Sequence, residues 1–125
     1  MGKSLRHARF IAAQRQSNRC YYCNVPMWED LPPTNFLQFT KSPKQTNRLR
    51  CTGEHLRARA DGGHKAAGNI VAACAFCNRT RHRAKRPLDP DAYRQRVGLR
   101  MSKGRWHPEW VHRFLAGSTF GGMIR

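Results

Sequence analysis

Four of the five cysteines of this chain stand in two pairs, Cys20–Cys23 and Cys74–Cys77, each with two residues between its members. This spacing lets both sulfurs of a pair face one point from a tight turn, which suits tetrahedral Zn²⁺ with bonds of about 2.3 Å. A disulfide framework is the competing interpretation, but the odd cysteine count weighs against it. One pair alone is also compatible with a redox motif. Two pairs favour a structural zinc site on Cys20, Cys23, Cys74 and Cys77, with Cys51 as a buried or half-buried spare.

The chain has 125 residues, and its 24 Lys and Arg against 7 Asp and Glu give a formal charge of +17. A chain of this length is expected to fold as a single domain. Its hydrophobic core would be small and is expected to need extra stabilisation, such as a bound zinc ion. Its apolar stretches fall far short of the roughly 20 residues of a membrane span, and no apolar segment typical of a secretory signal follows the basic N-terminus. We therefore expect a cytoplasmic protein without a membrane or small-molecule partner. The charge predicts a polyanionic partner, most simply nucleic acid.

Fifty residues separate the two cysteine pairs, far more than the roughly 15 to 20 of a simple zinc ribbon, so functional residues are sought in this insert. A turn signal at Asp61–Gly63 follows partial alternation over 49–60, which predicts a hairpin whose second strand leads into Cys74. Prolines over 29–49 predict a loop with one extended piece near 35–39. Pro90 and Gly98 mark the two ends of one helix. Helical patterns are expected over 4–16, 77–85, 89–97 and 106–115.

The insert contains Glu54-His55, a Gly-Gly turn and Asn69, and Asn78 directly follows Cys77. In order and spacing this pattern resembles the HNH endonucleases with a ββα-metal fold, in the subgroup with a Cys₄ zinc site and Asn at the last motif position. The resemblance covers residues 20 to about 83. It implies an α+β fold in one domain over 1–125: a small ββα-metal core at about 20–86, flanked by N- and C-terminal helices, with a C-terminal helical extension at about 89–116. It also implies a metal-dependent endonuclease that hydrolyses DNA phosphodiester bonds.

Phosphodiester cleavage requires an activated water and stabilisation of the leaving oxygen. Imidazole is a suitable general base near neutral pH, so His55 is expected to take a proton from the attacking water. Glu54 and Asn78 each offer an oxygen to a hard divalent cation distinct from the zinc. Adjacent strand residues point to opposite sides, so a bend or bulge is expected at Glu54-His55. By resemblance, Asn69 fixes the loop backbone and orients His55.

Two positions depart from the commonest family pattern. The first acidic residue is usually Asp and here is Glu54, whereas the last motif residue is often His and here is Asn78. Some members, including phage junction-resolving nucleases, resemble this chain in having Asn there beside a Cys₄ zinc site. An oxygen ligand in place of nitrogen favours Mg²⁺ or Mn²⁺ as the catalytic ion over softer metals.

The helix that carries Asn78 is strongly basic, and we expect it to bind the DNA backbone largely without sequence preference. A second cluster over residues 94–105 would extend this footprint, and Trp106 and Trp110 are expected in the core. Histidines other than His55 are expected in solvent or at phosphates. The predicted phosphate-binding residues are Arg79, Arg81, Arg83, Lys85 and Arg86.

Each of the proposed site residues also has a purely structural explanation. Glu54 alone would be explained by an ion pair with a nearby Arg, Asn78 by a helix cap and Asn69 by a turn. The alternative function is a noncatalytic, zinc-stapled protein that binds DNA or RNA, and a weaker one is a toxin that cleaves RNA at the same site.

Overall fold

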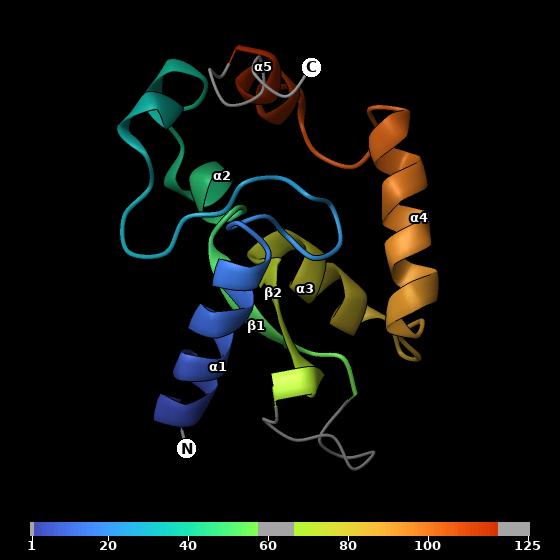
Figure 1. The fold of residues 1–125 in the computed structure, drawn as a ribbon. Helices are drawn as coiled ribbons and strands as arrows, with labels where there is room; N and C mark the ends of the chain where they lie inside the picture. The colour runs from blue at the N-terminus through green and yellow to red at the C-terminus, as the bar shows by residue number, and fades with distance from the viewer. Residues whose placement is uncertain (1, 58–66, 118–125) are drawn as a thin grey trace.

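The computed structural model describes residues 2–57 and 67–117, and within these ranges the chain has an α+β fold with one two-stranded antiparallel sheet and five α-helices (Figure 1). None of the helices in this described part is long and apolar enough to cross a membrane. The elements in chain order are α1 (Gly2–Arg15), a 3₁₀ turn (Thr34–Gln38), α2 (Pro43–Asn47), β1 (Cys51–His55), a 3₁₀ turn (Ala67–Asn69), β2 (Ile70–Cys74), α3 (Ala75–Arg83), α4 (Pro90–Ser102) and α5 (Glu109–Gly117).

Helices α1 and α3 pack against the sheet from different sides. Gly53 faces α1 so closely that a Cβ atom there would lie 3.2 Å from Leu5 Cδ1, which explains the glycine at this position of β1. The next residue, Glu54, points the other way and meets Arg81 of α3. Because successive strand residues alternate between faces, β1 presents its odd positions to α1 and its even positions to α3, and in β2 this order is reversed, since Glu54 lies opposite Val71.

The pairing of β1 with β2 is regular, so the predicted bulge at Glu54-His55 is wrong. Partners run one-to-one from Cys51 opposite Cys74 to His55 opposite Ile70. The predicted hairpin itself is confirmed, although its turn at 61–63 lies outside the described residues. A regular strand sends the Glu54 and His55 side chains to opposite faces of the sheet.

The free edges of the two strands are also occupied by hydrogen bonds. The Gln16 side-chain amide pairs with β2, donating from Nε2 to Ala72 O over 2.8 Å and accepting from Ala72 N over 2.9 Å. Ala72 O accepts a second bond from Tyr21 N. Along the edge of β1, Trp28 forms an isolated parallel bridge with Arg50.

Two predicted elements needed correction. The segment at 35–39 is part of a 3₁₀ turn, not extended, and the following α2 was not predicted. The signal for α2 is local, because Ser42 caps the helix by accepting from Gln45 N and Pro43 occupies its first turn. Helix α4 starts at the predicted Asp89 cap but continues through Gly98 to Ser102. It ends before Gly104, whose φ of 67° suits glycine.

The C-terminal helices pack on the hydrophobic core. Trp110 and Phe114 of α5 meet Phe36 edge-to-face, and the Tyr93 hydroxyl of α4 donates to Cys77 O over 2.7 Å. Trp110 is buried and Trp106 is half-buried against the same core, which confirms the prediction for both. The core therefore joins the segments before and after the hairpin to the cysteine cluster.

Candidate functional site

The four paired cysteines form one buried cluster, as predicted from their spacing. Their sulfur atoms all lie within 4.8 Å of one another, and the Cys23 and Cys74 sulfurs are 3.9 Å apart. Tetrahedral zinc with 2.3 Å bonds separates its sulfur ligands by about 3.8 Å, so the donor set fits Zn²⁺. Cys51 is buried outside this cluster, and burial raises its pKa to about 12. The prediction of a spare buried thiol is therefore confirmed.

Backbone N–H groups surround the sulfurs. Cys20 Sγ accepts from Tyr22 N and Cys74 N, each over 3.3 Å. Cys74 caps α3 by accepting from Cys77 N. Burial opposes ionisation of Cys20, but hydrogen bonds from the other three thiols outweigh it and hold its pKa well below the usual value. These donors compensate negative charge on the sulfurs in a site that water does not reach.

Two further donors come from the segment between α4 and α5. Trp106 Nε1 donates to Cys77 Sγ over 3.2 Å, and His107 Nε2 lies 3.3 Å from Cys23 Sγ. Burial, assisted by the Arg48 charge, lowers the pKa of His107 to about 3, so its ring is neutral. Because Arg48 Nε donates to Nδ1 over 2.9 Å, the ring proton sits on Nε2 and points at the sulfur. His107 thus lies in the core, and its predicted surface location is wrong.

Trp106→Phe should lower zinc affinity by about 10- to 100-fold, because it removes a donor to Cys77 and retains an aromatic ring. A competition titration with a chromogenic chelator measures the change. Trp110→Phe is the matched control, since that indole donates to Gln45 Oε1 and not to a sulfur. Equal zinc affinities in the two variants would contradict the assigned role of the Trp106 N–H.

Glu54 is the most buried charged residue of the described chain, at 1% exposure, and three side chains hold its carboxylate. Oε2 accepts from Tyr22 Oη and Arg81 Nη1, each over 2.8 Å. Oε1 lies 2.8 Å from His82 Nε2. Burial, and next the Glu54 charge, raise the pKa of Tyr22, so its hydroxyl stays protonated and donates. Because an ionised carboxylate only accepts hydrogen bonds, Nε2 is the protonated nitrogen of His82.

Asn78 binds the strand residues just before Glu54, whereas Asn69 lies directly before β2 and binds the segment after β1. Asn78 Nδ2 donates to Thr52 Oγ1 over 3.0 Å and to Gly53 O over 3.2 Å, which turns the amide oxygen away from these strand acceptors. Asn69 accepts from Arg57 N over 2.9 Å and donates to Arg57 O over 3.1 Å. This double contact fixes the backbone after β1, which is the loop-fixing part of the role expected for Asn69.

His55 ends β1 with a half-buried side chain. Its carbonyl oxygen lies 3.5 Å from Arg81 Nη1, within reach of a hydrogen bond. Since the strand is regular, its imidazole and the Glu54 carboxylate do not converge on one side of the sheet. His55 and Glu54 are thus sequence neighbours without a shared face.

Most of the predicted phosphate-binding residues are exposed on or just after α3, with one exception. Arg81 was also predicted to contact phosphate, but it is 7% exposed and its guanidinium binds Glu54 and Leu88 O. Helical spacing could have distinguished Arg81 from the exposed basic residues, because it lies three residues after Asn78 and therefore falls on the same, sheet-facing side of the helix. The exposed members are Arg79, Arg83, Lys85 and Arg86.

His82 is the residue that sequence reasoning missed. It lies four residues after Asn78, so both sit on neighbouring turns of one helix face, and this i, i+4 spacing was the available signal. Its side chain is 41% exposed although Nε2 reaches the buried carboxylate. A pocket of about 490 Å³ opens beside it, lined by Leu56, Arg57, Arg81, His82, Pro87, Asp89 and Pro90.

A family model described as HNH endonuclease matches residues 42–84. The match contains the sheet, α3 and the Cys74–Cys77 pair, and it leaves the Cys20–Cys23 pair, α4 and α5 outside. No curated protein and no solved structure matches the chain. Over residues 42–84, within an α+β fold and beside a Cys₄ cluster that fits zinc, this chain is similar to the HNH endonucleases.

Proposed function

We propose that the chain is a metal-dependent endonuclease that hydrolyses phosphodiester bonds in DNA. The observation that carries the proposal is the position of the buried Glu54 carboxylate, inside the family match and against the helix that bears Asn78 and His82. Between β1 and α3, the Glu54 carboxylate contacts His82, and Asn78 of the same helix binds Thr52 and Gly53 O of the same strand. Four exposed basic residues on and after α3 give the surface a charge that suits a phosphate backbone.

The donor set at this point fits a divalent ion. Glu54 and Asn78 would hold it through a carboxylate oxygen and an amide oxygen, which favour Mg²⁺ or Mn²⁺, and His82 would remain a hydrogen-bond donor to Glu54. Such an ion, when bound, supplies a positive charge for the leaving oxygen. Zinc held by the four cysteines would be structural, because all four candidate ligands are buried protein sulfurs.

The other proposed roles in cleavage and DNA binding belong to separate residues of the chain. His55 takes a proton from the attacking water. Because its ring and the Glu54 carboxylate point to opposite faces of β1, this role requires the end of the strand to turn the His55 ring toward the Glu54 face when DNA is bound. Asn69 holds the backbone of Leu56 and Arg57 and thereby the segment that follows His55. Tyr22 and Arg81 hold Glu54 in place through Oε2. The exposed arginines and lysine bind backbone phosphates without reading bases, so binding weakens steeply with salt.

His55→Ala should lower the rate of plasmid nicking at least ~100-fold, because it removes the general base. The assay uses supercoiled plasmid with added Mg²⁺ or Mn²⁺, and circular dichroism verifies that the variant is folded. His112→Ala on α5 is the control and should nick at the wild-type rate. Full activity in His55→Ala would contradict the role of His55 as general base. Full activity in His82→Ala would show that His82 is not needed for the reaction.

One observation favours the noncatalytic alternative, a zinc-stapled DNA- or RNA-binding protein. Both oxygens of Glu54 already have side-chain partners, as in a purely structural ion pair. The same assay separates the two functions, since a binding protein retards the plasmid and nicks it with neither ion. An RNA substrate in a parallel reaction tests the RNA-cleaving alternative.

A further inference from the structure

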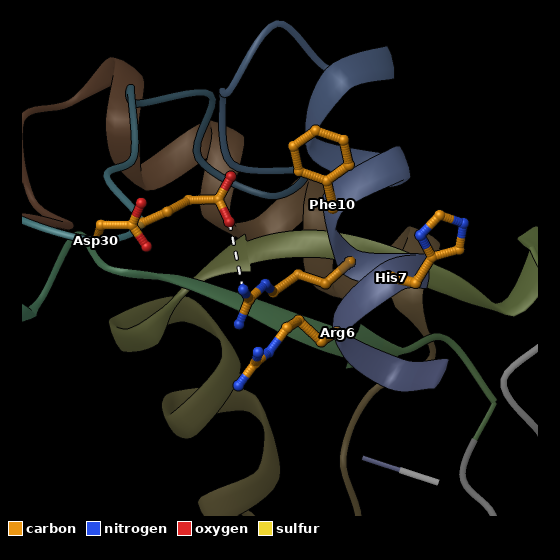
Figure 2. A pocket seen from close by; sticks show the side chains of 6 residues that line it. Arg6, His7, Phe10 and Asp30 are labelled. Carbon is orange, nitrogen blue, oxygen red and sulfur yellow. Dashed lines mark hydrogen bonds and ion pairs between the residues drawn. The ribbon is translucent and has the colours of Figure 1, made fainter. Parts of the chain in front are cut away.

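A second pocket, of about 510 Å³, lies between α1 and the segment after the Cys20–Cys23 pair, outside the residues of the family match. Figure 2 shows Arg6, His7 and Phe10 projecting from α1, with Asp30 on the neighbouring segment. The volume is within the roughly 300–1,000 Å³ of ligand sites. The lining residues are Arg6, His7, Arg9, Phe10, Glu29 and Asp30.

The cations of this pocket are only partly neutralised. Arg9 Nη2 binds Glu29 Oε1 over 3.3 Å, but its buried Nε has no hydrogen-bond partner among the described residues. Arg6 is exposed and forms no ion pair within residues 2–57 and 67–117. An anion placed here would meet the guanidinium of Arg6, which has no carboxylate partner in the described part of the chain, and that of Arg9, whose Nε has no hydrogen-bond partner there.

The pocket also has an aromatic wall. Phe10 is 49% exposed, one helical turn after Arg6, so the two side chains are neighbours on the surface of α1. A flat exposed ring beside a guanidinium suits a nucleobase stacked on the ring with its phosphate at the cation. A base within a duplex is already stacked on its neighbours, so the ring is available only to an unpaired one.

Asp30 adds chemical selectivity. Glu29 is occupied by Arg9, whereas Asp30 is exposed at the pocket with a carboxylate that has the capacity to accept hydrogen bonds. A carboxylate repels phosphate but accepts from an exocyclic amino group, as in pairing with cytosine N4. Thymine has no such group.

We propose that this pocket binds an unpaired nucleotide of single-stranded DNA, with the base on Phe10, its amino group at Asp30 and the adjacent phosphate at Arg6. The charge of +17 supports a polyanion as the occupant. The inference rests on the proposed function for the choice of DNA and deepens it, because it assigns the nuclease to substrates that contain a single-stranded segment.

Phe10→Ala should weaken binding to a short single-stranded DNA oligomer about tenfold and leave binding to the matching duplex unchanged. Fluorescence anisotropy measures both with the zinc-loaded protein and no added Mg²⁺ or Mn²⁺. Leu37→Ala is the matched control, since Leu37 is 64% exposed on the 3₁₀ turn at Thr34–Gln38 and does not line this pocket. Unchanged single-strand binding in Phe10→Ala, or an equal loss on duplex, would overturn the proposal.

The wild type should also prefer oligomers of deoxycytidine to those of deoxythymidine by about fivefold, and Asp30→Ala should abolish this preference. A preference that survives Asp30→Ala would contradict the assigned contact. Plasmid nicking is scored separately. If the wild type nicks plasmid but Phe10→Ala binds single-stranded DNA normally, the proposed nucleotide site is refuted and the proposed nuclease function stands. If Phe10→Ala loses single-strand binding but the wild type does not nick plasmid, the nuclease function is refuted and the nucleotide site stands.

Discussion

Cys77→Ser is expected to leave the chain largely unfolded at room temperature. Cys77 is fully buried and joins the other three sulfurs at the centre of the core. Zinc binding contributes on the order of 10–16 kcal/mol in zinc-finger peptides, as much as the whole net stability of about 5–15 kcal/mol of an ordinary domain. Far-UV circular dichroism and zinc content measured by mass spectrometry test this, and a strong chelator should produce the same change in the wild type.

Cys51→Ser is the matched control for this experiment. Cys51 is also buried, but it lies outside the cluster, so its loss should lower stability by only about 1–2 kcal/mol and leave one zinc bound. A Cys77→Ser protein that is folded, soluble and free of zinc would refute the structural role of the metal. Unfolding of both variants would assign the effect to thiol burial in general and not to zinc.

Arg81→Met should destabilise the protein by about 3–5 kcal/mol, because it leaves the Glu54 carboxylate buried without its cation. The two groups are 2.8 Å apart and nearly inaccessible to water. Urea denaturation of the zinc-loaded protein measures the loss. Because Glu54 stays hydrogen-bonded to Tyr22 and His82, a second substitution, Tyr22→Phe, should lower stability further in the Arg81→Met background.

Arg79→Met separates this structural role from phosphate binding. Arg79 lies exposed on the same helix, so its loss should change stability by less than about 0.5 kcal/mol and weaken DNA binding instead. If Arg81→Met were as stable as Arg79→Met and bound DNA equally poorly, Arg81 would be a phosphate contact, as its basic neighbours first indicated.

Features set by short spacing were predictable from the sequence. Two Cys-x-x-Cys pairs predicted the four-cysteine cluster that fits zinc, because a tight turn brings both sulfurs of each pair to one point. The Asp89-Pro90 pair gave the start of α4 because capping is local. Gly98 was misleading because a glycine inside a helix costs only about 1 kcal/mol, which the packing of Tyr93 and Val97 offsets.

Features that depend on packing between distant segments were not predictable in this way. His107 reaches Cys23 from 84 positions away, and nothing near either residue indicates the contact. The burial of Arg81 and the engagement of His82 follow from the way α3 lies on β1, since helix and strand together enclose Glu54. The sequence identified Glu54 as exceptional among so many cations, but which cations would neutralise it depended on the docking of the helix.

The hydrogen bonds along the outer edges of the hairpin also bear on solubility. A two-stranded sheet ordinarily presents two rows of unpaired peptide groups, which are templates for aggregation or strand exchange. Here the Gln16 side-chain amide forms two hydrogen bonds with the Ala72 backbone, as a neighbouring strand would. The Trp28 backbone pairs with Arg50 at the edge of β1. The segments that lead into and out of the first cysteine pair therefore occupy part of each outer edge of the hairpin, which leaves fewer peptide groups for another strand to pair with.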